Sequence, residues 1–299
     1  MIALENIIAH LKPVKVVGSQ GVTVKQVLSF DEANTDPAVI SWVNEKNIEK
    51  AYSAKAGVVM CPDTVDESRL PAGCTFMLFK FPRKAFSELL LAFFVKKRPG
   101  PGISKTAVLG NNVKLGKGVF IGHNTIIEDD VEIGDNVYIW HNNSILSGTI
   151  IRNNVQIGSN NTIGGVGFGY EKDEQGHYQA IPHIGGVLIE EKAEIGNNTC
   201  IDRAVMGYTV LKKNCKIDNL VHIAHGVVVG ENSLVIAHAM VGGSTIIGDN
   251  VWVAPNAALI NKITIGNNAT IGLGAVVVKN VKDNETVIGN PAKPMIKIG

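Results

Sequence analysis

Aliphatic side chains recur at every sixth residue along most of this chain after residue 108. One run begins at Leu109 and a second at Leu211, with a short run in a shifted register between them. A helix repeats its apolar face about every 3.6 residues and a plain strand every 2, so a period of six fits neither. It predicts short strands separated by turns, with one aliphatic side chain of each strand pointing inward. The repeated positions are Leu109, Leu115, Ile121, Ile127, Ile133, Ile139, Ile145, Ile151, Ile157 and Ile163, then Ile189, Ile195 and Ile201, then Leu211, Ile217, Ile223, Val229, Val235, Val241, Ile247, Val253, Leu259, Ile265, Ile271 and Val277.

The turns between these strands carry residues that tolerate left-handed backbone angles. Gly-Asn-Asn follows the aliphatic position at 110–112, 196–198 and 266–268, and Gly-Asp-Asn follows it at 134–136 and 248–250. Three segments are the fewest that enclose an apolar core, so a coil has about 18 residues and pairs with the next coil through parallel strands. The pattern therefore predicts a mainly β fold, a parallel β-helix solenoid of about eight coils. The unbroken runs argue against a β-sandwich or a flat parallel sheet.

Residues 1–98 lack this repeat and predict a small α/β domain. A Pro- and Gly-rich linker is expected over 99–105, and the solenoid domain over 106–299. A polar insertion at 165–186 interrupts the solenoid, and an excursion of that length from a regular prism favours a functional role. The expected elements of the first domain are helices over 4–11 and 83–95 and strands over 14–17, 22–27, 39–43, 57–61 and 75–79.

Composition and charge exclude several classes of protein. The 28 basic and 27 acidic residues leave a net charge of +1, which gives no support for a nucleic-acid partner. The N-terminus lacks the basic start and apolar run of a signal peptide, and the longest apolar run, 89–95, is far too short for a membrane span. The four cysteines have no zinc-ligand spacing. We therefore expect no bound metal and a cytoplasmic protein with reduced thiols.

Candidate chemistry lies outside the prism, because aliphatic side chains fill its interior. Asp218, His222 and His225 fall between the core positions and therefore point outward. A histidine can take a proton from an attacking amine or hydroxyl, and a nearby carboxylate can fix its tautomer. Gly243 follows His225 by one coil of about 18 residues, so its N–H could receive a developing oxyanion. These residues are a candidate base, orienting carboxylate and oxyanion donor; the alternative is a set of ordinary surface residues.

The other histidines are weaker candidates. His123 and His141 occupy the same hexad position one coil apart, so they should stack on one face. A plain surface ladder is favoured over a metal pair, because no third histidine extends it. His177 and His183 lie in the insertion, where they could contact substrate.

At these residues the chain resembles a known family, the left-handed β-helix (hexapeptide-repeat) acyltransferases, and within it the LpxD-like N-acyltransferases of lipid A synthesis. The resemblance implies a left-handed coil, a homotrimer with active sites between subunits, and transfer of an acyl group, such as a 3-hydroxyacyl chain, from a thioester to the amino group of a nucleotide-linked amino sugar. It carries the base onto His225, its orienting carboxylate onto Asp218 and the oxyanion N–H onto Gly243. The matching stretches are 167–170 (Gly-Phe-Gly-Tyr), 181–185 (Ile-Pro-His-Ile-Gly), 199–203 (Thr-Cys-Ile-Asp-Arg), 217–219 (Ile-Asp-Asn) and 223–225 (Ile-Ala-His).

The same resemblance implies contacts with the substrate. The family's uracil-holding segment falls on 41–47, which makes the first domain a candidate nucleotide-binding domain. Trp42 could stack on the base and Asn44 matches the family, whereas Asn47 replaces a tyrosine. Further candidate substrate-binding residues are Phe168, Tyr170, His183 and His222.

The chain departs from the family at two places. Lys262 stands where the family has a second histidine, and a Gly-Asn-Pro-Ala-Lys segment at 289–293 replaces the helices that engage acyl carrier protein. That segment is similar to the coenzyme A-dependent sugar acetyltransferases, so the thioester donor stays open between acyl carrier protein and acyl-coenzyme A. Neither donor requires a tightly bound cofactor. A non-catalytic scaffold or ice-binding surface is the alternative from another class, but the flat array of outward threonines that it needs is missing.

Overall fold

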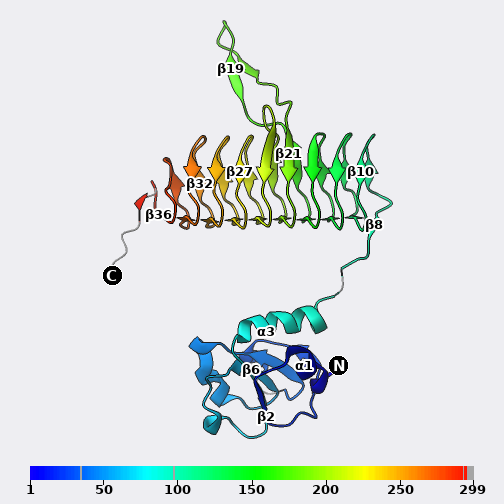
Figure 1. Ribbon diagram of the computed structural model, residues 1–299, viewed down its shortest axis with the longest axis vertical. Helices are drawn as coiled ribbons and strands as arrows, with labels where there is room; N and C mark the ends of the chain where they lie inside the picture. The colour runs from blue at the N-terminus through cyan, green and yellow to red at the C-terminus, as the bar shows by residue number, and fades with distance from the viewer. Residues whose placement is uncertain (34–35, 97, 292, 295–299) are drawn as a thin grey trace. The chain divides into compact units, whose positions relative to one another are not determined.

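The computed structural model describes residues 1–33, 36–96, 98–291 and 293–294. The chain forms two compact units, Met1–Arg98 and Pro99–Gly299. Residues 295–299 of the expected solenoid domain, and Ala292 of the segment at 289–293, lie outside the described residues. Figure 1 shows the two units, which are described separately below.

The first unit is a mixed β-sheet covered by helices. Helices α1 (Leu4–Leu11) and α3 (Pro82–Leu89) bury Leu4, Ile7 and Leu89 against Met60 and Met77 of the sheet. The five-stranded sheet has the order β2 (Lys15–Val17), β7 (Thr75–Phe79), β6 (Val58–Pro62), β5 (Val39–Trp42) and β4 (Gln26–Val27), with β2 antiparallel to β7 and the other pairs parallel. The remaining elements are β1 (Ile2–Ala3), β3 (Thr23–Val24), α1 (Leu4–Leu11), α2 (Phe30–Ala33), η1 (Glu45–Ser53), η2 (Glu67–Arg69), α3 (Pro82–Leu89) and η3 (Leu90–Phe94).

The expected elements of this unit are present with small changes. The predicted helix over 83–95 is an α-helix only to Leu89 and continues as a π-helical turn, η3. The predicted strand over 22–27 is split into β3 and β4, which belong to different sheets. The small α/β domain is confirmed.

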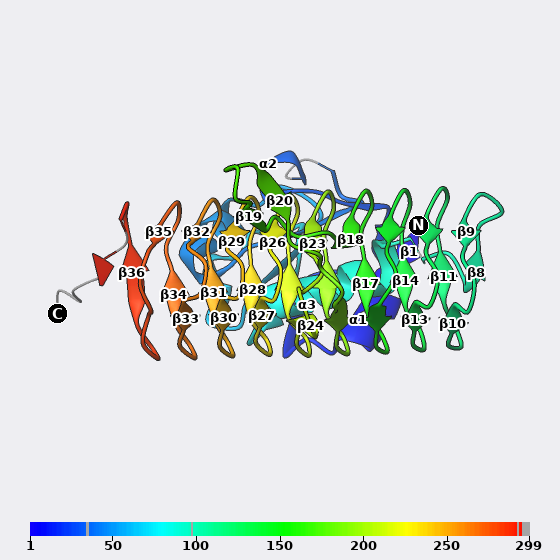
Figure 2. The same cartoon turned by 90° about the horizontal axis from the view of Figure 1, so that it is seen from above.

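The second unit is a left-handed parallel β-helix whose three faces are parallel sheets (Figures 1 and 2). Face I holds β10 (Lys114–Leu115), β13 (Glu132–Ile133), β16 (Thr149–Ile151), β21 (Gly186–Ile189), β24 (Tyr208–Leu211), β27 (Val228–Val229), β30 (Ile246–Ile247) and β33 (Thr264–Ile265). Face II holds β8 (Gly102–Ile103), β11 (Phe120–Ile121), β14 (Tyr138–Ile139), β17 (Gln156–Ile157), β22 (Glu194–Ile195), β25 (Lys216–Ile217), β28 (Leu234–Val235), β31 (Trp252–Val253), β34 (Thr270–Ile271), β36 (Thr286–Ile288) and the antiparallel β37 (Lys293–Pro294). Face III holds β9 (Val108–Leu109), β12 (Ile126–Ile127), β15 (Ser144–Ile145), β18 (Thr162–Gly165), β23 (Cys200–Asp202), β26 (His222–Ile223), β29 (Met240–Val241), β32 (Ala258–Leu259) and β35 (Val276–Val277).

The hexad positions form the apolar interior, as predicted. Ile121, Ile139 and Ile223 are fully buried, and each strand pairs with its neighbour through these positions. Leu109 and Leu115 differ, with 38% and 36% of their surface exposed, because they lie in the first coil and have a neighbouring coil on one side only. Part of the expected linker belongs to the solenoid, since β8 already pairs with β11.

A buried polar ladder also lines one corner of the prism, and the sequence pattern did not predict it. Asn161 N–H donates to Asn143 Oδ1 at 2.9 Å, and Thr199 N–H donates to Asn161 Oδ1 at 2.8 Å. Asn143 Nδ2 donates to the carbonyl of Gly158 at 2.8 Å. Each buried amide group therefore has partners in adjacent coils, which removes most of the cost of burying it.

The insertion leaves the corner between faces III and I and projects as a hairpin (Figure 1). Its strands are β19 (Tyr170–Lys172) and β20 (Tyr178–Ala180), which pair antiparallel. Arg203 holds its base, with Nε donating to the carbonyl of Gly164 at 2.6 Å and its backbone N–H donating to Gly165 at 2.8 Å. In the described part of the chain, no helix is long and apolar enough to cross a membrane.

Candidate active site

His225 lies in the turn that follows β26, at the same corner from which the insertion leaves. Hydrogen bonds fix the turn on both sides. Gly226 N–H donates to the buried Thr209 Oγ1 at 2.8 Å, and Ser244 N–H donates to the carbonyl of His225 at 2.8 Å. Gly226 has φ 67°, a left-handed angle that glycine adopts without strain. The backbone therefore presents the imidazole in a fixed direction.

Gly243 lies directly above His225, where the coil length predicted it. A β-carbon on Gly243 would stand 2.7 Å from His225 Nε2 and 2.8 Å from Cε1, so only glycine leaves room for the ring. In regular coils the matching backbone N–H donates to a side chain of the next coil, as Lys117 does to Asp135 Oδ1 at 2.7 Å. The N–H of Gly243 has no such acceptor among the described residues. Gly243 is buried beneath the ring of His225, and its N–H beside Nε2 has no protein acceptor in the described structure.

The structure does not bring Asp218 to His225. Asp218 follows β25 on face II, where Oδ1 accepts from the N–H of Asn219 at 2.7 Å and Oδ2 from Ala237 at 3.2 Å. These bonds cap two turns of the prism, and no hydrogen bond or ion pair joins Asp218 to His225 within the described residues. A coil of about 18 residues relates positions on the same face. Asp218 follows a strand of face II and His225 a strand of face III, so the coil length does not bring them together.

Asp202 is the carboxylate that faces the histidines. Its side chain is 13% exposed, and Oδ2 lies 3.7 Å from Nε2 of His222, which points outward from β26 as predicted. Burial raises the pKa of Asp202, and His222, His225 and His183 each offset part of that rise. The sequence signal for Asp202 is that Ile201 ends the short hexad run and an acidic residue follows it directly.

His225 has the electrostatics of a neutral base. Burial lowers its pKa, the neighbouring His183 and Lys262 lower it further, and Asp202 raises it in part. A lowered pKa keeps the imidazole unprotonated at neutral pH, so it can accept a proton. Lys262 lies in the next coil beside this site, and its backbone N–H donates to the carbonyl of Gly243 at 2.9 Å.

His183 lies against His225 at the base of the insertion. The two ring centroids are 5.1 Å apart and the rings meet edge to face at 74°. His183 is only 7% exposed, and its Nδ1 donates to the carbonyl of Ile181 at 2.8 Å. Its Nε2 is buried without a hydrogen-bond partner in the described structure. If His183 contacts substrate, as predicted, Nε2 is the atom that is free to do so.

The two aromatic candidates of the insertion lie at its surface. Phe168 is 85% exposed and Tyr170 44%, and their ring centroids are 4.8 Å apart. Among the described residues, neither ring forms a ring–ring pair with His225. His177 is also on this hairpin, 3.7 Å from Asp173, and its side chain is 80% exposed. A role for Phe168 and Tyr170 in binding substrate stays a prediction.

His123 and His141 stack as predicted, with ring centroids 5.2 Å apart and 29° between the planes. The N–H of His123 donates to Nδ1 of His141 at 2.8 Å. Within the described ranges no group of three or more histidine, cysteine or acidic side chains could hold a metal ion. Both Nδ1 atoms take part in hydrogen bonds of the turns, because Nδ1 of His123 lies 2.7 Å from Oγ of Ser104.

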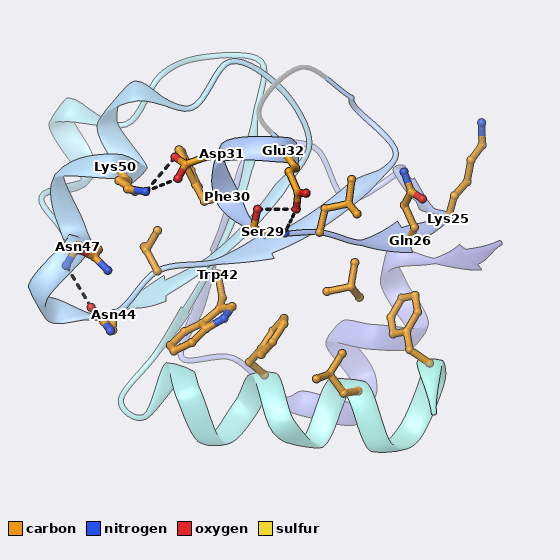
Figure 3. Close-up of a pocket in the computed structure, with 16 residues that line it drawn as sticks. Lys25, Gln26, Ser29, Phe30, Asp31, Glu32, Trp42, Asn44, Asn47 and Lys50 are labelled. Atoms are coloured by element: carbon orange, nitrogen blue, oxygen red, sulfur yellow. Dashed lines mark hydrogen bonds and ion pairs between the residues drawn. The ribbon is translucent and has the colours of Figure 1, made fainter. Parts of the chain in front are cut away.

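A second candidate site is a cavity of about 820 Å³ in the first unit (Figure 3). Trp42 and Asn44 both line it, as does Asn47. Trp42 stacks on Phe86 with ring centroids 5.3 Å apart, so one face of its indole is already covered. Asn44 Oδ1 accepts from the N–H of Asn47 at 3.1 Å and caps η1, which leaves its Nδ2 free to donate. The charged residues of the lining are balanced, because Asp31 and Glu32 accompany Lys25 and Lys50, and Nζ of Lys50 pairs with Oδ2 of Asp31 at 2.7 Å (Figure 3).

Comparisons with known proteins agree with this architecture. The model of the bacterial transferase hexapeptide family (six repeats) matches residues 106–145, 130–165 and 244–279. The fold resembles a solved UDP-N-acetylglucosamine acyltransferase of Francisella novicida, with a TM-score of 0.60, 23% identity, and coverage of 65% of this chain and 70% of that one. At this identity the likeness concerns the fold alone.

Two curated relatives carry the same name, UDP-3-O-acylglucosamine N-acyltransferase. The chain is 54% identical over 134 residues to that of Desulfotalea psychrophila, an alignment that spans 45% of this chain but only 39% of the relative. It is 47% identical over 307 residues to that of Syntrophus aciditrophicus, which covers 97% of this chain and 84% of the relative. With similarity over almost its whole length, the chain belongs to the UDP-3-O-acylglucosamine N-acyltransferase (LpxD) family of hexapeptide-repeat acyltransferases.

Proposed function

We propose that this protein transfers an acyl chain, such as a 3-hydroxyacyl group, from a thioester to the amino group of a UDP-3-O-acylglucosamine, a step of lipid A biosynthesis. The observation that carries the proposal is the contact of His225 with Gly243, which sets a neutral base beside an uncommitted backbone N–H. Acyl transfer to an amine needs both groups at one carbonyl. The substrate is that named for the relatives.

The reaction follows from these two groups. The amine nitrogen attacks the thioester carbonyl carbon, and His225 takes one proton from it as the carbon–nitrogen bond forms. The N–H of Gly243 donates to the oxyanion of the tetrahedral intermediate. The carbon–sulfur bond then breaks, and the protonated His225 returns its proton to the leaving thiolate. Asp202 stabilises the imidazolium in between, because its carboxylate already raises the pKa of His225.

The nucleotide would bind in the cavity of the first unit. The open face of Trp42 can stack on a pyrimidine ring, and Nδ2 of Asn44 can donate to a carbonyl of the base. Lys25 of the lining can pair with a diphosphate, whereas Lys50 already pairs with Asp31. Asn47 lines the same cavity in place of the family's tyrosine, so a hydrogen-bonding amide takes the place of a second ring.

A homotrimer is supported by the outer surface of face I. The outward side chains of its five central strands, β16 to β30, form an apolar row, and Ile246 at one end of this row is 49% exposed. A second copy of the chain would cover such a row. The site at His225 lies on the corner beside it, where a neighbouring subunit could complete a cleft. The row consists of Ile150, Leu188, Val210, Val228 and Ile246.

Acyl carrier protein is the donor we favour, because the curated relatives bear the N-acyltransferase name and acyl carrier protein is the donor implied for that family. An acetyl-coenzyme A-dependent enzyme is the weaker candidate. Both donors are consumed in the reaction, and no further cofactor is required. We assign the reaction to the cytoplasm, in keeping with four free cysteines in the described chain.

The proposal is tested by the release of thiol from purified protein with a matrix of substrates. The donors are a 3-hydroxyacyl carrier protein and acetyl-coenzyme A, and the acceptors are UDP-3-O-acylglucosamine and a dTDP-linked amino sugar. Turnover is expected with the carrier protein and the UDP-linked acceptor. Turnover only with acetyl-coenzyme A would contradict the proposed donor, and turnover only with the dTDP sugar would contradict the acceptor.

A further inference from the structure

We propose that Nε2 of His183 accepts a hydrogen bond from the attacking amino group of the substrate, and that this bond makes the site select amines over hydroxyls. The inference rests on the proposed function, since it concerns the acceptor of the same acyl transfer. It gives His183 the role of a substrate-positioning and specificity-determining residue beside the base, His225.

The hydrogen bonds of His183 decide which atom is available. The carbonyl of Ile181 can only accept, so Nδ1 of His183 must carry the proton of their 2.8 Å bond. In the neutral ring Nε2 then holds a lone pair and needs a donor. It has none in the described structure, although the residue is only 7% exposed. A buried polar atom without a partner is destabilising, so a bound ligand that donates to it would recover the loss.

The placement of His183 matches one proton of an attacking amine. The ring of His183 meets that of His225 edge to face with centroids 5.1 Å apart, so a small group held at this corner would lie near both rings. A primary amine offers a lone pair for attack and two N–H bonds, one for each histidine. A hydroxyl offers a single O–H, which the base takes, and leaves Nε2 of His183 without a partner. The two acceptors together therefore discriminate by the number of protons on the nucleophile.

Access to this nitrogen is controlled by the start of the insertion. A β-carbon on Gly167 would lie 2.7 Å from Nε2 of His183 and 2.8 Å from Cβ of His225, so Gly167 covers the Nε2 edge of the His183 ring. An amino group reaches Nε2 when this segment shifts by the width of one group.

The test compares His183→Leu with His183→Gln, whose amide oxygen can still accept, and with His177→Leu, an exposed histidine of the same hairpin. Affinity is measured for UDP-3-O-acylglucosamine and for its 2-hydroxyl analogue, without donor, and turnover is then measured with both. His183→Leu is expected to weaken binding and kcat/KM for the amine by about tenfold and to leave the hydroxyl analogue unchanged. His183→Gln should retain most of the preference, and His177→Leu all of it.

Thermal unfolding separates this role from a structural one. Leucine removes an unpartnered nitrogen from a buried position, so the Tm of His183→Leu should be unchanged or higher. Equal losses for amine and hydroxyl, or a fall in Tm that accompanies the loss, would overturn the role of His183. If the wild-type protein and His183→Leu acylate UDP-3-O-acylglucosamine at the same rate, this inference is overturned and the proposed function stands. A wild-type protein that neither binds nor acylates it would refute both.

Discussion

Two pairs of histidines lie on the same solenoid and differ in the angle between their rings and in the hydrogen bonds of their ring nitrogens. His123 and His141 are stacked at 29°, and the backbone N–H of His123 and the hydroxyl of Ser104 bond to their Nδ1 atoms at 2.8 and 2.7 Å. His183 and His225 meet edge to face at 74°, and a free Nε2 remains on His183. Ring separation does not distinguish the pairs, because the centroids are 5.2 and 5.1 Å apart.

The difference comes from the regularity of the coils. His123 and His141 occupy one hexad position in successive regular coils, where a ladder of side chains caps the turns. At His225 the ladder is broken, because Gly243 has no side chain and the insertion brings His183 and Gly167 from outside the repeat. Asp202 adds a carboxylate to the second pair. The proposed catalytic geometry therefore lies where the repeat is interrupted, and the regular coils on either side support it.

The largest expected effect is on the base. His225→Ala should lower kcat by about 10²-fold or more, because it removes the group proposed to take the proton of the amine. His141→Ala removes a histidine of the regular ladder and should leave kcat unchanged. Steady-state rates of thiol release check both variants, and circular dichroism checks that they fold. Equal losses in the two variants would remove the distinction between the pairs.

Gly243→Ala should have the next largest effect. The new methyl group would stand 2.7 Å from Nε2 of His225, so the ring must turn away from the oxyanion position. We expect a loss of about 10²-fold in kcat. Gly102→Ala is the control, because a methyl group there meets no atom within 4 Å. Wild-type kcat in Gly243→Ala would refute the oxyanion assignment.

Asp202→Asn should change the pH profile as well as the rate. The charge of Asp202 raises the pKa of His225, so its removal lowers that pKa further. Since kcat/KM increases as the base loses its proton, the acidic limb of the profile should move to lower pH. Because the protonated His225 is less stabilised without the carboxylate, kcat should fall about tenfold, the equivalent of one pKa unit. Asp218→Asn should leave the limb in place; a shift there instead would restore Asp218 as the partner of the base.

The smallest effect concerns stability. His141→Ala removes the acceptor of the His123 N–H, which should lower the free energy of unfolding by about 1 kcal/mol. His177→Ala, an exposed residue of the hairpin, is the matched control and should change it by much less. Urea unfolding measures both. A loss of activity in His141→Ala without a loss of stability would give the ladder a role that its geometry does not suggest.

Much of the fold and part of the site follow from the sequence because the repeat is local. The hexads predicted the buried interior, and a coil of about 18 residues correctly placed Gly243 on His225. The same arithmetic cannot place Asp202, because the insertion and the next connection change the offset between paired strands. Ile163 pairs with Ile201, and Ile201 pairs with Ile223, at spacings other than 18.

His183 and the buried asparagines were difficult for a related reason. The position of His183 depends on how a hairpin outside the repeat returns to the prism, and no periodicity describes that path. Asn143 and Asn161 are polar residues at corner positions, which a hydrophobic pattern assigns to the surface. Their burial becomes favourable only through hydrogen bonds to adjacent coils.

The most direct test of the central claim is a crystal structure with the N-acylated product bound. The account predicts that the amide oxygen of the product lies about 3 Å from the N–H of Gly243 and the amide nitrogen beside His225 and His183. A product bound beside the His123 and His141 ladder, or one whose amide points away from Gly243, would contradict it.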